Sequence, residues 1–315
     1  MQLNSTQQFD SRNLREILTS VVVRHIAFFI CCAAGAVLFY SPVVQVFRMS
    51  SHNRLYSHIP LIPVVTLFIL FYTRKEIFTD ARWNWLRGLP LMAAGGLFFS
   101  AGKHFGGLQE HNYLATVMSG AVVWLIGSFV LAYGSRAFKK ALFPLLFLVF
   151  VIPVPTPILD PLVKALQTGS AAATELVFKV IGVPLHREGF SFSIPGITVE
   201  VAEQCSGIRS SLALIITSVL AGYLFLRKGW SKIVLVLSIF PITVFKNALR
   251  IVTLSLLAVY VDPRFIGPSW LHMSGGIPFF GVGLLLLAPV LWGLRKAEKA
   301  GGQRSEIRTS GTKGK

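Results

Sequence analysis

The chain has 315 residues, of which 53% are hydrophobic and only 14% are charged, and its mean hydropathy is +0.65. This composition is too apolar for a water-soluble domain of this length, so it excludes the soluble enzyme and binding-protein classes and predicts a protein whose solvent is mostly lipid. The formal net charge of +17 raises the alternative of nucleic-acid binding. That alternative depends on where the basic residues fall relative to the apolar stretches.

Apolar stretches recur along most of the chain. A bilayer core of about 30 Å takes roughly 20 residues of apolar helix, and somewhat fewer where the bilayer thins. Eight stretches qualify, three of them short, so we expect an all-α polytopic membrane protein with about eight transmembrane helices. They are Ile26–Phe47, Ile59–Tyr72, Leu89–Lys103, Leu114–Tyr133, Leu142–Pro155, Gly207–Leu226, Ile233–Tyr260 and Ile277–Leu294.

The basic residues favour one side of these spans. Twenty of the 30 Lys and Arg residues lie before the first span or after the second, fourth, sixth and eighth, and seven lie on the other side. Because cytoplasmic loops retain Lys and Arg, this distribution places both termini in the cytoplasm. The charge is thus explained by topology, and no nucleic-acid partner is expected. The remaining three, Arg209, Lys246 and Arg250, lie within or at the edge of spans.

The longest segment predicted outside, Thr156–Gln204, has two parts. Apolar residues at helical spacing predict an amphipathic helix over Leu162–Ile181, lying on the outer membrane surface. A crossing there would invert the later loops against the positive-inside distribution. Apolar and polar residues then alternate from Phe190 to Val201 around a Pro195-Gly196 turn, which predicts a small β-hairpin before the sixth span.

Three regions follow from this layout. Residues 1–155 form an N-terminal five-span region, and residues 156–294 hold the outer segment and three spans. Residues 295–315 form a basic cytoplasmic tail whose polar, glycine-rich composition favours disorder.

A first candidate motif, VAEQCSGIRSS, spans Val201–Ser211. It places Cys205 where a helix begins at the outer membrane surface, with Glu203 just before it. The positive end of the helix dipole favours a thiolate, and so does Arg209, four residues along on the same helical face. The alternative is a buried structural cysteine, the commoner fate of a single free thiol.

A second motif, FKNALRIV, lies at Phe245–Val252 inside an apolar span. Ionisable residues at membrane depth cost about 2.5 to 3.5 kcal/mol on insertion scales, so they usually face the interior of a helix bundle and serve a function. Asn247 and Arg250 are three residues apart and share a helical face. The alternative is that Lys246 snorkels to the inner surface and Arg250 pairs with a carboxylate.

A third motif, PSWLHMSGGIPFF, places His272 on the outside, directly ahead of the last span. A lone histidine beside a tryptophan there is usually part of the aromatic belt. Cys205, however, is predicted on the same side, and Arg250 lies towards it. Cysteine with histidine is a nucleophile and base arrangement, and a guanidinium stabilises a thiolate or an oxyanion.

These three motifs in this order resemble the exosortase and archaeosortase family of membrane cysteine transpeptidases. The resemblance implies that Cys205 is the nucleophile, Arg250 the essential cation and His272 the third catalytic residue, with Arg209 and Asn247 as supporting members. His272 favours the bacterial exosortase branch, since an arginine stands there in the archaeal branch. The site would then face outward from the bacterial cytoplasmic (inner) membrane.

The same resemblance implies the substrates. They would be exported proteins with a carboxy-terminal Pro-Glu-Pro-like motif, a transmembrane helix and a basic tail, often coupled to exopolysaccharide export. Such proteins are cleaved through a thioester acyl-enzyme and passed to an unidentified lipid or glycan acceptor, or to water. No cofactor is expected, and no metal, since the chain lacks a His-Glu-x-x-His pair.

Two other classes remain open. A transporter or flippase of an anionic lipid-linked substrate would use Arg209, Lys246 and Arg250 as an intramembrane anion site. A scaffold of an export complex would tolerate substitution of all three catalytic candidates. The transporter would need the charges and not Cys205.

Overall fold

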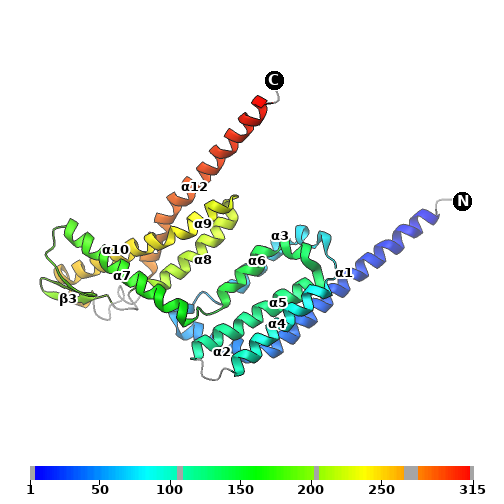
Figure 1. The fold of residues 1–315 in the computed structure, drawn as a ribbon, viewed down its shortest axis with the longest axis horizontal. Helices are drawn as coiled ribbons and strands as arrows, with labels where there is room; N and C mark the ends of the chain where they lie inside the picture. Colours follow the sequence, from blue (N-terminus) through cyan, green and yellow to red (C-terminus); the bar gives the residue numbers. More distant parts are fainter. Residues whose placement is uncertain (1–3, 105–108, 202–205, 266–275, 313–315) are drawn as a thin grey trace. The chain divides into compact units, whose positions relative to one another are not determined.

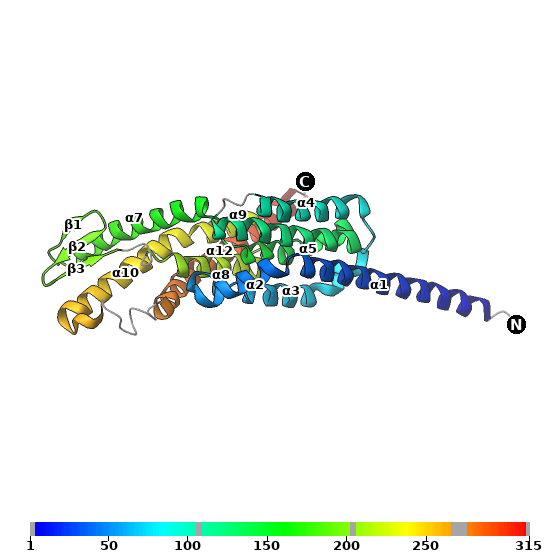
Figure 2. The ribbon, with the colours of Figure 1, turned by 90° about the horizontal axis from the view of Figure 1, so that it is seen from below.

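The computed structural model describes residues 4–104, 109–201, 206–265 and 276–312. The described chain is mostly helical, with one small sheet (Figures 1 and 2). It divides into two compact units, Met1–Thr156 and Pro157–Lys315. The fold is that of an all-α polytopic membrane protein.

The first unit is entirely helical in its described part. Its elements are α1 (Asn4–Leu38), α2 (Tyr40–His52), η1 (Arg54–Tyr56), α3 (Leu61–Ile77), η2 (Phe78–Asp80), α4 (Trp85–His104), α5 (Glu110–Lys140), α6 (Leu142–Phe147) and η3 (Leu148–Val151).

The second unit adds the sheet. Its elements are α7 (Thr156–Val180), β1 (His186–Glu188), β2 (Ser191–Ile194), β3 (Ile197–Glu200), α8 (Ile208–Phe225), α9 (Gly229–Leu237), α10 (Ile239–Tyr260), η5 (Pro263–Phe265) and α12 (Gly276–Thr312).

The described helices include six that are long and apolar enough to cross a membrane. The number rises to seven if α6–η3 and the following α7 form one broken span. The sequence predicts about eight. The difference is the Leu89–Lys103 stretch, which lies in the 20-residue α4 but is not among the six, because its glycines and flanking charges dilute its apolar character.

Backbone contact between α4 and α5 holds the first unit together, and the two helices run side by side in both views (Figures 1 and 2). Gly88, Gly95 and Gly102 follow one another at seven-residue spacing on α4. A Cβ at Gly95 would lie 2.7 Å from the carbonyl oxygen of Gly120, and one at Gly127 would lie 2.7 Å from a backbone nitrogen of α4. Small residues allow this approach, which replaces the hydrophobic drive that helices lack in lipid.

The two ends of the first unit agree with the predicted alternation of loops. At one end, Tyr56 Oη and His111 Nε2 are 2.7 Å apart, and His111 Nε2 lies 2.7 Å from the carbonyl oxygen of Val154. At the other end, Lys140 Nζ lies 3.0 Å from Asp80 Oδ2. Segments predicted on one side of the membrane therefore meet at one end. Which end faces the cytoplasm stays a prediction.

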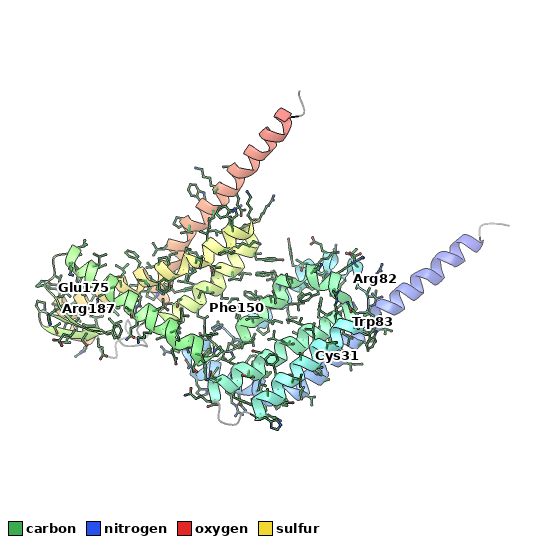
Figure 3. The ribbon with its side chains drawn as sticks, in the orientation of Figure 1. Cys31, Arg82, Trp83, Phe150, Glu175 and Arg187 are labelled. Carbon is green, nitrogen blue, oxygen red and sulfur yellow. The ribbon has the colours of Figure 1, made fainter. Side chains whose placement is uncertain are left out.

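In the second unit, an antiparallel sheet of order β1-β2-β3 packs on α7 and α10. The predicted hairpin is present, with Phe192 opposite Val199 and Ile194 opposite Ile197. Strand β1 extends it, although His186-Arg187-Glu188 lacks an apolar alternation. Arg187 Nη1 lies 2.8 Å from Glu175 Oε2 and ties β1 to α7 (Figure 3).

Helix α12 runs past Leu294 to Thr312, through the segment whose composition favours disorder. The carboxylate of Glu298 accepts the backbone N–H groups of Arg227 and Lys228 at 2.9 and 2.8 Å. These two bonds tie the helix just beyond residue 294 to the segment before α9, and disorder of the tail stays a prediction.

The α4–α5 contact predicts that alanine at two neighbouring glycine positions has different effects on stability. Gly95→Ala should lower the thermal stability of the detergent-solubilised protein, because its Cβ would meet backbone atoms and overpacking costs about 1 to 3 kcal/mol. Gly96→Ala is the matched control, since a Cβ there has no atom of the described chain within 4 Å. Equal melting temperatures for the two variants would contradict the contact.

Candidate functional site

The candidate catalytic residues differ in how far the structure places them. Glu203, Cys205 and His272 lie outside the described residues. Arg209 is exposed in the first turn of α8, while Asn247 is buried and Arg250 half-buried on α10. Described residues on α7, α8 and α10 therefore define the candidate site.

Gly207 brings the first motif against the second. It has φ +81° and ψ 8°, the left-handed conformation that favours glycine, and it is the N-cap of α8. A Cβ at this position would lie 3.1 Å from Cγ of Asn247. The turn that follows Cys205 thus lies directly on the face of α10 that carries Asn247, forty residues further along the chain.

Asn247 also joins this turn to α7. It is 1% exposed, and its Nδ2 donates to Oγ of the fully buried Ser170 at 3.0 Å. One turn earlier on α7, buried Gln167 donates from Nε2 to the carbonyl oxygen of Val201 at 2.7 Å, at the end of the hairpin. Three segments that precede or line the candidate site are therefore held by buried amide hydrogen bonds.

The polar stripe on α7 has a role that the predicted outer surface helix over Leu162–Ile181 does not include. Gln167, Ser170 and Thr174 lie on this helix and are all buried. Their spacing of three and four residues on one face, flanked by buried Leu166 and Phe178, was the signal that could have revealed a polar face turned inward. The location of α7 on the outer membrane surface remains a prediction.

Lys246 lies in the interior of the second unit. It is 1% exposed, and its ammonium group hydrogen-bonds to Oγ of Ser210, whose hydroxyl in turn donates to the carbonyl oxygen of Gly207 at 3.0 Å. Gly283 on α12 gives its side chain room, since a Cβ there would lie 3.3 Å from Lys246 Cδ. Lys246 does not snorkel to a surface in this structure, and it supports the turn before α8.

The arrangement gathers positive charge near the start of α8. Lys246 and Arg250 lie four residues apart on α10, and Arg209 lies beside the Gly207 turn on α8. Cations in a site partly shielded from water stabilise an anion more strongly than they would in bulk solvent. Such a site suits a thiolate, an oxyanion or an anionic substrate.

A metal centre has no candidate within the ranges that the structure describes, where no three His, Cys, Asp or Glu side chains cluster. Cys205, Glu203 and His272 are not among those residues. The expectation of a metal-free and cofactor-free site therefore stays a prediction.

A helical fold with several helices long and apolar enough to cross a bilayer defines this protein as a polytopic membrane protein. A family model described as transmembrane exosortase (Exosortase_EpsH) matches residues 50–289, about three quarters of the chain. The chain belongs to the transmembrane exosortase family. The match includes all three catalytic candidates. No curated protein and no solved structure matched the chain.

The contact between Gly207 and Asn247 predicts that a side chain at position 207 lowers stability by more than the backbone strain alone. Gly207→Ala should destabilise the protein by roughly 1 to 2 kcal/mol through the left-handed backbone alone, with a further loss from the clash at Asn247. Gly182→Ala is the control, because Gly182 has a similar φ of +74° and no neighbour of the described chain near its Cβ. Thermal unfolding in detergent measures both. A loss no larger than that of Gly182→Ala would show that the contact is unimportant.

Proposed function

We propose that this exosortase-family protein is a cysteine transpeptidase or protease that cleaves carboxy-terminal sorting signals of exported proteins. The observation that carries the proposal is the packing of Gly207 on Asn247, since it supports the association of the Cys-Ser-Gly-Ile-Arg motif with the Asn-x-x-Arg motif. A nucleophile and an oxyanion-stabilising cation must be near each other for acyl transfer.

In this mechanism, the thiolate of Cys205 bonds to the carbonyl carbon of the scissile peptide, and Arg250 stabilises the negative charge on the carbonyl oxygen. The C–N bond then breaks as His272 gives its proton to the departing amine, which leaves a thioester. A lipid or glycan acceptor, or water, attacks the thioester and passes a proton back to His272. The thiolate is thereby regenerated.

The other residues position this chemistry. Arg209 adds positive charge on the face of α8 that begins beside the thiol, and Glu203 lies two residues before it. Asn247 holds the turn through its contacts with Gly207 and Ser170. The substrate would present a Pro-Glu-Pro-like motif at the outer face of a bacterial inner membrane, with its basic tail in the cytoplasm.

One observation favours the transporter class as the competitor. The buried cation Lys246, with Arg250 one turn away, is the kind of intramembrane charge that also binds anionic substrates. The two functions differ in their need for Cys205.

Processing of a reporter protein distinguishes the transpeptidase from the transporter. An exported protein with a carboxy-terminal Pro-Glu-Pro-like motif, a transmembrane helix and a basic tail should be shortened in cells that make this protein and not in cells that make Cys205→Ala. Immunoblotting measures the cleaved fraction. The control is the double variant Cys31→Ala, Cys32→Ala, which removes two free half-buried thiols of α1 and should process normally. Full processing by Cys205→Ala would end the transpeptidase proposal.

Thiol labelling tests which side of the membrane Cys205 faces and whether the charge of Arg250 favours its thiolate. In a background without Cys31 and Cys32, a membrane-impermeant maleimide should label Cys205 in intact cells. Labelling should slow on the order of tenfold in Arg250→Ala, equivalent to about 1.4 kcal/mol of lost thiolate stabilisation. Labelling only after the cytoplasmic side is opened would refute the predicted orientation, and an inert Cys205 would favour the transporter.

A further inference from the structure

A second cationic site lies in the first unit, between the segment that joins α3 to α4 and the kink in α5. It is a cavity of about 530 Å³, within the range of small-molecule sites. Figure 3 labels Arg82 and Trp83 in this region. The lining residues are Asp80, Arg82, Trp83, Asn84, Leu86, Arg87, Gly134, Ser135, Arg136 and Lys139.

The backbone segments around this cavity are hydrogen-bonded to each other. Gly134 interrupts α5 with φ +82°, and a Cβ there would lie 2.4 Å from the carbonyl oxygen of Arg82. The N–H groups of Arg82 and Asn84 donate to the carbonyl oxygens of Tyr133 and Leu131, each at 3.1 Å. The loop and the kinked helix therefore form one surface.

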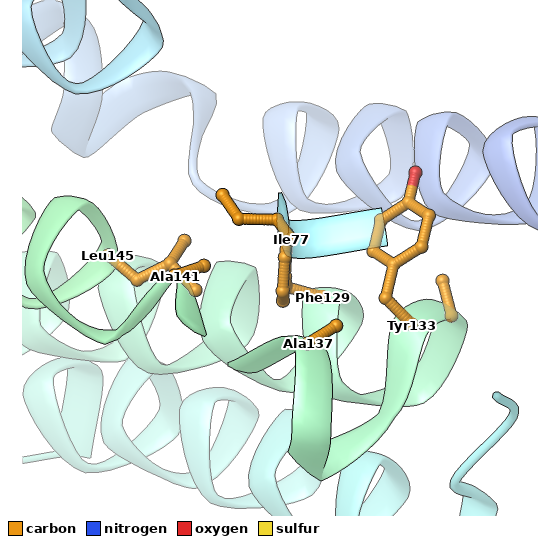
Figure 4. Packing of buried hydrophobic residues seen from close by; sticks show 7 residues of the cluster. Ile77, Phe129, Tyr133, Ala137, Ala141 and Leu145 are labelled. Atoms are coloured by element: carbon orange, nitrogen blue, oxygen red, sulfur yellow. The ribbon is translucent and has the colours of Figure 1, made fainter. Parts of the chain in front are cut away.

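A hydrophobic cluster supports that surface from within. It joins the end of α3 to both sides of the kink in α5 and to α6 (Figure 4), and its members are Ile77, Phe129, Ala132, Tyr133, Ala137, Ala141 and Leu145. The cavity thus rests on a packed core.

Several side-chain acceptors of the lining already take part in hydrogen bonds or ion pairs. Oγ of Ser135 accepts from Asn84 Nδ2 at 2.9 Å and from Arg87 Nη1 at 3.2 Å, which fills both of its acceptor positions. Oδ1 of Asn84 accepts from the backbone N–H of Arg87 at 3.2 Å. The carboxylate of Asp80 is paired with Lys140. The lining therefore offers mainly donors.

The charge of the lining agrees with this hydrogen-bond pattern. Four cations, Arg82, Arg87, Arg136 and Lys139, stand against the single carboxylate of Asp80. Arginine guanidinium groups match the geometry of phosphate oxygens, with two parallel hydrogen bonds per group. A phosphate ester is the ligand chemistry that these groups suit best.

Apolar side chains at the same place favour a lipid as the source of the phosphate. Leu86 and Trp85 are 87% and 57% exposed, and Trp83 stacks on Trp85 with ring centroids 5.3 Å apart. Tryptophan pairs of this kind sit at the headgroup level of a bilayer. The loop is also one that the positive-inside distribution assigns to the cytoplasmic side, where anionic lipid attracts Lys and Arg.

We infer that this cavity binds a phosphate ester, and that the headgroup of an anionic phospholipid fills it. The site is independent of the cysteine chemistry proposed above.

Native mass spectrometry of the detergent-purified full-length protein tests the site, with phosphatidylglycerol, phosphatidylcholine and inorganic phosphate as separate probes. The double variant Arg82→Gln, Arg136→Gln should bind phosphatidylglycerol about tenfold more weakly than the wild type, because two charge-assisted contacts are lost. The matched control is Arg74→Gln, Lys75→Gln, which removes the same charge from the last turn of α3, outside the lining. This control should bind like the wild type.

Each other outcome overturns a stated part of the inference. Equal losses in the two double variants would mean that only general charge attracts lipid, and unchanged binding in both would remove the site. Binding of inorganic phosphate that depends on Arg82 and Arg136, without preference for phosphatidylglycerol, would replace the lipid by a soluble phosphate. If the double variant melts much earlier than the wild type, Arg136→Gln alone repeats the comparison, since Arg136 is exposed.

Discussion

The interior of a helical membrane protein offers buried polar groups little water, so most of them must find hydrogen-bond partners in the protein. Asn247 shows how much of the second unit depends on this constraint. Its amide donates to Ser170 of α7, and its side chain packs on Gly207 at the start of α8. The next stabilising contact, from Gln167 to Val201, fixes the end of the hairpin. Val201 and Gly207, described residues on either side of Cys205 in the sequence, are thus both held by contacts with buried amide side chains.

Close approach between backbone segments is the second recurring feature of the structure. Glycine allows it in two ways. Along α4 and α5, helical glycines let two long helices touch, which stabilises the bundle where lipid provides no hydrophobic drive. At Gly134 and Gly207 the backbone is left-handed instead, and the chain turns against a neighbouring segment. Each of those two turns lies beside a group of cations, with Arg209 and Lys246 near Gly207 and Arg82 and Arg136 near Gly134.

The two cationic groups are built on different principles. Lys246 is almost fully buried and hydrogen-bonds to the hydroxyl of Ser210, so its charge is kept inside the second unit. Arg82 and Arg136 are exposed, in a lining where several side-chain acceptors are already bonded. A buried cation costs free energy unless the protein pairs or hydrogen-bonds it, whereas exposed cations attract anions from the solvent.

The sequence by itself determined the class of the protein, because apolar stretches indicate membrane spans and the positions of Lys and Arg predict their orientation. It also determined the family, since three short motifs carry it, and it predicted the β2–β3 hairpin from its alternation. Only the tertiary structure decided that Gln167 faces inward, that β1 joins the sheet and that Gly207 lies on Asn247. It also decided that the chain around Arg82 and the segment around Arg136 line one cavity. The physical reason is that these features depend on contacts between residues distant in the chain, which no local pattern of hydropathy encodes.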